Sequence, residues 1–148
     1  MSRIELVELM EPGDVNIRGF VHGGVIMRLA DTAAGLAAVR HAAMSVVTAS
    51  VDSLAFLAPV HVGDLVHLIA ELTRVWRTSM EVEVEVWREI VSTGESQLTT
   101  TAFFTMVGVD EHGSPVPVPP LIAETDEQIR RAAAADERRA RRLDLRGA

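Results

Sequence analysis

The chain has 148 residues, 48% of them hydrophobic and 24% charged, a composition typical of one globular domain and not of a disordered segment. It contains no cysteine, which excludes disulfides, cysteine-ligated metals and a thiol nucleophile. The net charge of −7 is opposite to that of most nucleic-acid-binding proteins, and no apolar run is long enough to span a membrane. We therefore expect a cytoplasmic protein with neither a nucleic-acid nor a membrane partner.

Hydrophobic periodicity predicts the following elements in chain order. A short strand covers residues 3–9, and a turn and a glycine-containing loop lead to a long apolar stretch, Val25 to Arg40, which predicts a buried central helix. Four strands follow, at 46–56, 65–76, 80–87 and 97–109. The strand from Met80 to Trp87 alternates glutamate with apolar residues, so we expect one packed face and one solvated face.

A helix that is apolar on every side needs a sheet curled around it, and one helix followed by antiparallel strands is typical of an α+β fold. We assign residues 1–121 to this domain and residues 122–148 to a C-terminal helical tail. The tail helix is expected over 123–142, with Thr125 as N-cap and Gln128 three residues later. Seven of the 14 basic residues lie in this tail, interleaved with acids. This pattern predicts a solvated helix face, with anion binding as the alternative.

The start of the central helix is the first candidate site. Gly23 and Gly24 precede Val25, and no Ser, Thr, Asp or Asn stands at the capping position. The first backbone N–H groups therefore lack an obvious side-chain acceptor, and glycine allows another group to approach closely. Such a helix start can stabilise an oxyanion. The alternative is a Gly-Gly turn that only packs against the sheet.

Asp31, in the middle of the same apolar helix, is the second candidate. An unpaired carboxylate is unfavourable in such a setting unless it has a function. The alternatives are an ion pair with Arg28 or an exposed helix edge. Asp31 follows Gly24 by seven residues, about 10 Å along the helix axis. Because a base and an oxyanion donor must share one reacting centre, we expect the two groups to come from different chains of a dimer.

Two residues of the preceding loop, Asn16 and His22, could line the same site. The Asn16 carboxamide could orient water or a carbonyl, although a loop asparagine often only stabilises a turn. His22 could exchange protons or merely bond to backbone. The five histidines show no metal-ligand spacing, so we expect no metal.

Arg77, Thr78 and Ser79 stand between two predicted strands, where a guanidinium and two hydroxyls could hold phosphate. From the residues alone, a polar hairpin turn is the favoured interpretation.

The segment from His22 to Asp31 resembles the hot-dog-fold acyl-CoA thioesterases, in particular the cytosolic acyl-CoA hydrolase (YciA-like) branch. The resemblance continues through most of the chain and includes these further segments: 46–52, 56–64, 78–84, 102–105 and 117–125. It implies a long helix wrapped by a five-stranded antiparallel sheet, with dimers that assemble into a trimer of dimers, a hexamer.

The resemblance also implies hydrolysis of acyl-CoA to a free fatty acid and CoA. Asp31 matches the family's catalytic acid, as general base or nucleophile, and Asn16 matches its loop amide. His22, Gly23, Gly24 and Val25 would bind the substrate and its oxyanion, and Arg77, Thr78 and Ser79 would bind CoA. No cofactor is implied beyond the CoA of the substrate. The alternatives are a non-catalytic acyl-CoA-binding module and a hot-dog enoyl-CoA hydratase.

Overall fold

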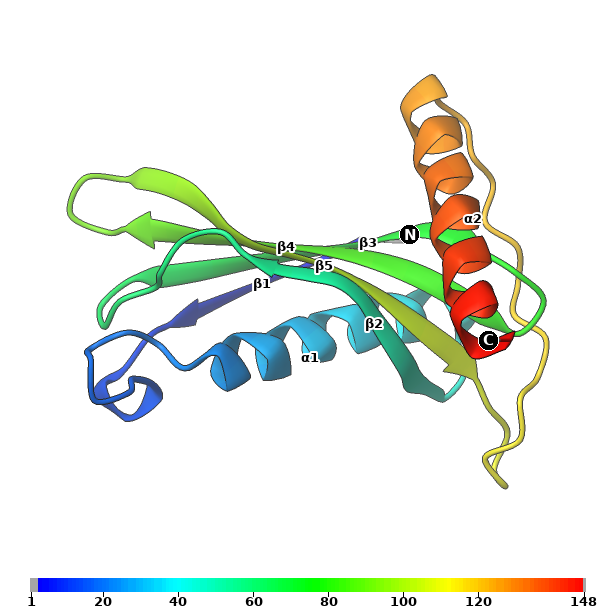
Figure 1. The fold of residues 1–148 in the computed structure, drawn as a ribbon, viewed down its shortest axis with the longest axis horizontal. Helices are drawn as coiled ribbons and strands as arrows, with labels where there is room; N and C mark the ends of the chain where they lie inside the picture. The colour runs from blue at the N-terminus through cyan, green and yellow to red at the C-terminus, as the bar shows by residue number, and fades with distance from the viewer. Residues whose placement is uncertain (1–2, 148) are drawn as a thin grey trace.

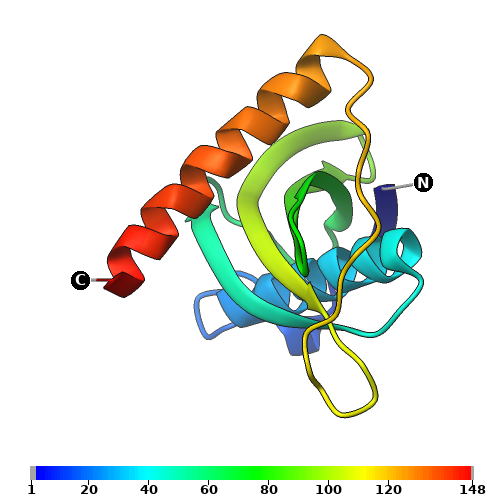
Figure 2. The same ribbon diagram turned by 90° about the vertical axis from the view of Figure 1, so that its right-hand side faces the viewer.

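The structure is a computed structural model that describes residues 3–147. Strand β1 (Arg3–Leu9) and a short 3-10 turn, η1 (Pro12–Asp14), precede the long helix α1 (Gly23–Ala42). Four strands follow, and a second helix ends the chain: β2 (Val46–Phe56), β3 (Leu65–Val75), β4 (Ser79–Ile90), β5 (Glu95–Gly108) and α2 (Asp126–Gly147). The strands form one antiparallel sheet in the order β1-β3-β4-β5-β2, which curls around α1 as predicted (Figures 1 and 2).

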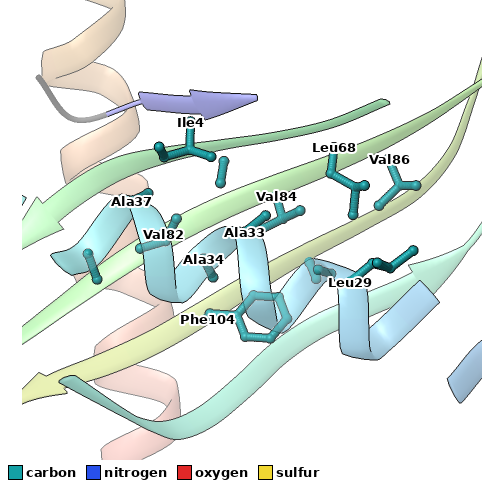
Figure 3. Packing of buried hydrophobic residues seen from close by; sticks show 14 of the residues in the cluster. Ile4, Leu29, Ala33, Ala34, Ala37, Leu68, Val82, Val84, Val86 and Phe104 are labelled. Carbon is teal, nitrogen blue, oxygen red and sulfur yellow. The ribbon is translucent and has the colours of Figure 1, made fainter. Parts of the chain in front are cut away.

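The main core lies between α1 and the concave face of the sheet. Small α1 side chains, Ala33, Ala34 and Ala37 among them, are fully buried, so the helix lies close to the strands. They pack with inward-facing residues of the central strands such as Val82 and Phe104 (Figure 3). Burial of this apolar surface supplies most of the free energy that holds helix and sheet together. Within residues 3–147, neither helix is both long and apolar enough to cross a lipid bilayer.

The prediction that α1 is buried on every side is only half right, because the sheet covers a single side of the helix. The other side remains exposed in the single chain, and its apolar residues Met27, Leu36 and Val39 are each more than 40% exposed. The outer edge strand β2 continues this surface with Val51, whose cross-strand partner Phe104 also faces α1. Apolar residues thus follow a helix face and an adjacent sheet edge.

The predicted solvated face of β4 is wrong, because α2 lies across the convex side of the sheet and covers it (Figure 2). Glu81 is fully buried there, and its carboxylate accepts hydrogen bonds from Arg138 Nε and Nη2 at 3.0 and 2.7 Å. Arg131 lies between Glu83 and Glu71, at 3.0 and 3.3 Å. Three of the seven tail arginines thus pair with carboxylates of the sheet, the third being Arg142 with Asp52.

Burial alone would lower the pKa of Arg131, but the carboxylates of Glu83 and Glu71 outweigh it and raise that pKa above its ordinary value. A raised pKa adds stability that is fully present below the unfolded value and is lost only in strong alkali. The contribution of Arg131 to holding α2 on the sheet is therefore constant over the physiological pH range.

The start of α2 is capped as predicted: Thr125 Oγ1 accepts from Gln128 N, and Gln128 Oε1 accepts from Thr125 N, both at 3.1 Å.

A bulge in β2 changes which way its side chains point. Thr48 pairs with Met106 and faces α1, whereas Ser50 pairs with Thr105 and faces α2, because the register shifts between Thr48 and Ser50. Without the extra residue, positions 48 and 50 would point to the same face. The bulge therefore places one hydroxyl on each side of the sheet.

Candidate active site

Asp31 lies on the exposed side of α1, and one of its oxygens is held by the neighbouring strand. Thr48 Oγ1 donates a hydrogen bond to Asp31 Oδ1 at 2.6 Å. Among residues 3–147, Asp31 forms no ion pair, so the alternative of a pair with Arg28 is wrong. The result is an oriented carboxylate whose second oxygen has no protein hydrogen bond in the described part of the chain.

Thr48 was missed by the sequence analysis. A threonine in a β-branched strand is common, and nothing in its neighbours marks it as a partner for Asp31. The signal that would find it is the bulge, which is a property of the pairing of β2 with β5 and not of the local sequence.

The start of α1 has unoccupied backbone donors, as predicted. His22 is the N-cap residue and makes no side-chain capping bond. Val25 N–H donates to His22 O at 3.0 Å, whereas the N–H groups of Gly23 and Gly24 have no acceptor within the described residues. A Cβ added to Gly24 would meet nothing within 4 Å. Gly23 and Gly24 can therefore donate to a ligand oxyanion, and Val25 has its donor already engaged.

The loop before the helix is organised around Asn16. Its Oδ1 accepts from the backbone N–H groups of Arg18 and Phe20, at 2.9 and 3.2 Å. These donors identify the accepting atom as oxygen, so the Nδ2 group is the free end of the carboxamide. Asn16 Oδ1 therefore stabilises the turn, while Asn16 Nδ2 is available to bind a ligand. The backbone bond from His22 N to Asp14 O, 2.9 Å, closes this loop against the helix start.

A cavity of about 370 Å³ opens beside the first turn of α1. Its walls are mainly apolar and come from the helix start and the segment after β2, including Gly23, Ile26 and Phe56. The ring of Phe56 is so close that a Cβ on Gly23 would lie 3.3 Å from Cζ. The cavity is thus a place for an apolar group next to the free N–H donors.

Asp31 and the glycine pair lie on one helix, seven positions apart, and so about 10 Å from each other along its axis. Within one chain they do not meet at a single reacting atom. Asn16, His22 and the glycines are brought together, and Asp31 with Thr48 forms a second group farther along α1.

Arg77, Thr78 and Ser79 lie at the turn between β3 and β4, away from Asp31. Ser79 pairs with Val107 of β5, and both residues line a hollow beneath α2, on the opposite face of the sheet from Asp31. Arg77 is exposed. One chain therefore does not place this turn beside the candidate catalytic carboxylate. No group of three or more potential metal ligands occurs among residues 3–147.

Comparisons with known proteins agree with this architecture. A family model described as "Thioesterase superfamily" matches residues 18–95. The "Cytosolic acyl coenzyme A thioester hydrolase" of Rattus norvegicus is 38% identical over 132 residues, which are 88% of this chain but only 35% of the rat protein. The chain thus spans about a third of the length of that relative.

Two solved structures are similar over nearly the whole chain. An apo-hexameric acyl-CoA thioesterase has a TM-score of 0.93 and 42% identity, and the match covers 97% of this chain and 92% of that one. An acyl-CoA hydrolase from Staphylococcus aureus, in complex with butyryl coenzyme A, coenzyme A and coenzyme A disulfide, has a TM-score of 0.87 and 31% identity, with coverages of 99% and 92%. Structures also exist of that enzyme with an aspartate, an asparagine or a threonine changed to alanine. The chain belongs to the thioesterase superfamily, and it has the hot-dog fold of that family.

Proposed function

We propose that the protein hydrolyses acyl-CoA thioesters to a carboxylic acid and free CoA. The observation that carries the proposal is the Asp31 carboxylate, oriented by Thr48 and otherwise free, on the uncovered side of α1. The unoccupied N–H donors at the start of that helix provide the second group that acyl transfer needs. Similarity to acyl-CoA thioester hydrolases along the chain supports the choice of substrate class.

The variants of the S. aureus hydrolase support the assignment of residues. The asparagine, aspartate and threonine replaced in that enzyme have the same spacing along the chain as Asn16, Asp31 and Thr48 here. The three side chains that we single out on geometry therefore coincide with the three positions chosen for replacement in a related hydrolase.

The complete site in this proposal forms between two copies of the chain. Asp31 of one protomer and the Gly23–Gly24 donors of its partner face one thioester, because one helix holds them too far apart. The exposed apolar residues of α1 and β2 provide a surface for such an association. Hexameric relatives support a trimer of dimers as the final assembly. We place this assembly in the cytoplasm.

In the proposed reaction, the Asp31 carboxylate either removes a proton from the attacking water or attacks the carbonyl carbon itself. The carbonyl oxygen becomes an oxyanion that accepts hydrogen bonds from the glycine N–H groups. When water attacks, the C–S bond breaks, the thiolate takes the proton held by Asp31, and the acid leaves. When Asp31 attacks, C–S cleavage gives a mixed anhydride of Asp31 and the acyl group, and the thiolate takes a proton from solvent; water then hydrolyses the anhydride, which releases the acid and restores the Asp31 carboxylate. Asn16 Nδ2 orients the water or the carbonyl, and neither route needs a metal or a redox cofactor.

Thr48→Val should lower kcat for acyl-CoA hydrolysis by about tenfold to a hundredfold, because a hydrogen bond to a charged group contributes about 1.5–3 kcal/mol. The Asp31 carboxylate is exposed in the single chain, so the protomer should remain folded. Steady-state kinetics of Thr48→Val beside Thr48→Ser, which keeps the hydroxyl, provides the measurement. Equal kcat values for the two variants would remove Thr48 from the positioning role.

Asn16→Asp should preserve the loop and still reduce turnover. An aspartate can accept the same bonds from Arg18 and Phe20 N–H, but it cannot donate in place of Nδ2. We expect kcat/KM to fall by about tenfold or more with the melting temperature nearly unchanged. Asn16→Ala, which also loses the turn bonds, should lower both quantities. A fall in melting temperature alone would assign Asn16 a purely structural role.

The activity itself is tested by following free thiol release from acyl-CoAs between acetyl and palmitoyl, with and without a chelator. Turnover that is unchanged by the chelator is expected. Tight binding of acyl-CoA without thiol release would instead establish a binding module. Hydration of crotonyl-CoA without thiol release would establish a hydratase.

A further inference from the structure

The turn between β2 and β3 supports the active-site loop, residues 15–22. Phe20 of the loop forms an isolated antiparallel bridge with His61 of the turn, and Val21 N–H donates to Val60 O at 2.8 Å. The rings of Phe20 and His61 also meet edge to face, with their centroids 5.3 Å apart. The position of the active-site loop therefore depends on the shape of this turn.

A buried carboxylate, that of Asp64, closes the turn. Asp64 is only 5% exposed, and its Oδ2 accepts a hydrogen bond from His61 N–H at 2.8 Å. Asp64 N–H donates to His61 O at 3.1 Å, so the two residues are joined in both directions. The Asp64 carbonyl also accepts from Met10 N–H at 2.9 Å, directly after β1. A movement of Asp64 would thus displace the residue on which Phe20 rests.

The Asp64 carboxylate is itself fixed by a guanidinium group of the sheet. Arg88 of β4 places Nε 3.0 Å from Asp64 Oδ2 and Nη2 3.4 Å from Oδ1. Arg88 pairs with the fully buried Val66 of β3, so its side chain extends from the concave side of the sheet, where α1 lies. The side chains of Arg88 and Asp64 are 16% and 8% exposed. A largely buried ion pair thus connects the central sheet to the turn.

The same turn forms part of the apolar cavity beside the glycine donors. Pro59 and Val60 of the turn line this cavity together with Val21 of the loop and Gly23 of α1. The turn therefore determines two features of the candidate site, the position of the active-site loop and the cavity wall next to the glycine N–H groups.

We propose that Asp64 is a positioning residue for hydrolysis, which acts through the active-site loop and does not contact the substrate. Held by Arg88, its carboxylate fixes His61, and His61 fixes the loop so that Asn16 Nδ2 faces the reacting group. Replacing a buried ion pair by apolar groups of the same shape is often neutral for stability, which favours a role in geometry. The inference rests on the proposed function, in which Asn16 Nδ2 orients the water or the carbonyl.

Asp64→Ala should lower kcat for acyl-CoA hydrolysis by about tenfold and leave KM within about twofold, because Asn16 acts on the reacting group and not on CoA. Asp64→Asn keeps an oxygen acceptor for His61 N–H and should restore kcat to within about threefold of wild type. The matched control is Asp110→Ala. Asp110 Oδ1 also accepts two backbone N–H bonds at 2.9 Å, but in an exposed turn after β5, so kcat should not change.

A double-mutant cycle shows whether Asp64 acts through Asn16. In an Asn16→Asp background, Asp64→Ala should reduce kcat by less than about threefold, since the amide that it positions is already absent. In a Thr48→Val background it should still reduce kcat by about tenfold, because Thr48 contacts Asp31 and not the loop. Equal reductions in the wild-type and both variant backgrounds would overturn the proposal.

If Asp64→Ala does not fold, His61→Ala takes its place, because the His61 side chain is 41% exposed and only its ring contact with Phe20 is removed. That variant should lower kcat by about threefold, and an unchanged kcat would count against the proposal.

Hydrogen exchange tests the link between Asp64 and the loop apart from the activity. In Asp64→Ala, the amides of residues 15–24 should exchange faster than in wild type, whereas those of α2 should exchange at the same rate. Unchanged exchange in residues 15–24 together with an unchanged kcat overturns the proposal. Faster exchange in a protein whose wild type releases no thiol refutes the hydrolysis and leaves the structural link standing.

Discussion

Asp31→Asn is expected to reduce kcat/KM for acyl-CoA hydrolysis by about 10²–10⁴-fold, the range that a general base contributes. The change removes the negative charge and keeps the shape of the side chain. An asparagine Oδ1 can still accept the hydrogen bond from Thr48, so α1 and β2 should keep their relative positions. Steady-state thiol release measures the loss, and size-exclusion chromatography should give the same assembly as wild type.

The matched control is Glu8→Gln, which removes the charge of an exposed carboxylate that has no ion pair among the described residues. It should retain full activity. A fully active Asp31→Asn protein would contradict the assignment of Asp31. A single turnover in ¹⁸O-labelled water then separates two mechanisms, because label that appears in Asp31 requires an aspartyl anhydride.

Most of the fold could be predicted, because its elements are encoded by local patterns. Alternation defined the strands, the absence of breakers defined α1, and Thr125 with Gln128 marked the start of α2. The prediction that failed concerns which faces of the sheet are covered by other elements. The glutamates of β4 look the same whether water or arginines of α2 lie opposite them, so their burial depends on a tertiary contact that local periodicity does not contain.

The candidate site shows the same division. Asp31 and the glycine pair are unusual in their own segment, an acid in an apolar helix and an uncapped helix start, so the residues alone pointed to them. Thr48 is ordinary in its segment and gains its role only from the β2 bulge. Ser79 was assigned to CoA binding by resemblance, and the pairing of β4 with β5 places it on the other face of the sheet from Asp31.

Arg138→Met should lower the free energy of unfolding by about 3–5 kcal/mol, the loss expected when one partner of a buried ion pair is removed. The side chain of Arg138 is only 14% exposed and that of Glu81 is fully buried. In the variant, Glu81 would keep only the bond from Thr73 Oγ1 at 2.6 Å, and its charge would remain beneath α2. The stacking of the guanidinium over Phe103, 3.7 Å from the ring centroid, would also be lost.

Urea unfolding at a fixed protein concentration measures this loss, since assembly would make stability depend on concentration. The double variant Arg138→Met with Glu81→Leu is the decisive comparison, because replacing both charges by apolar groups leaves no unpaired carboxylate. It should recover most of the lost stability, whereas Arg130→Met, at an exposed position of α2, should change stability by less than about 0.5 kcal/mol. If the double variant is no more stable than Arg138→Met, the stranded charge of Glu81 is not the cause, and packing of the arginine on Phe103 must carry the contact between α2 and the sheet.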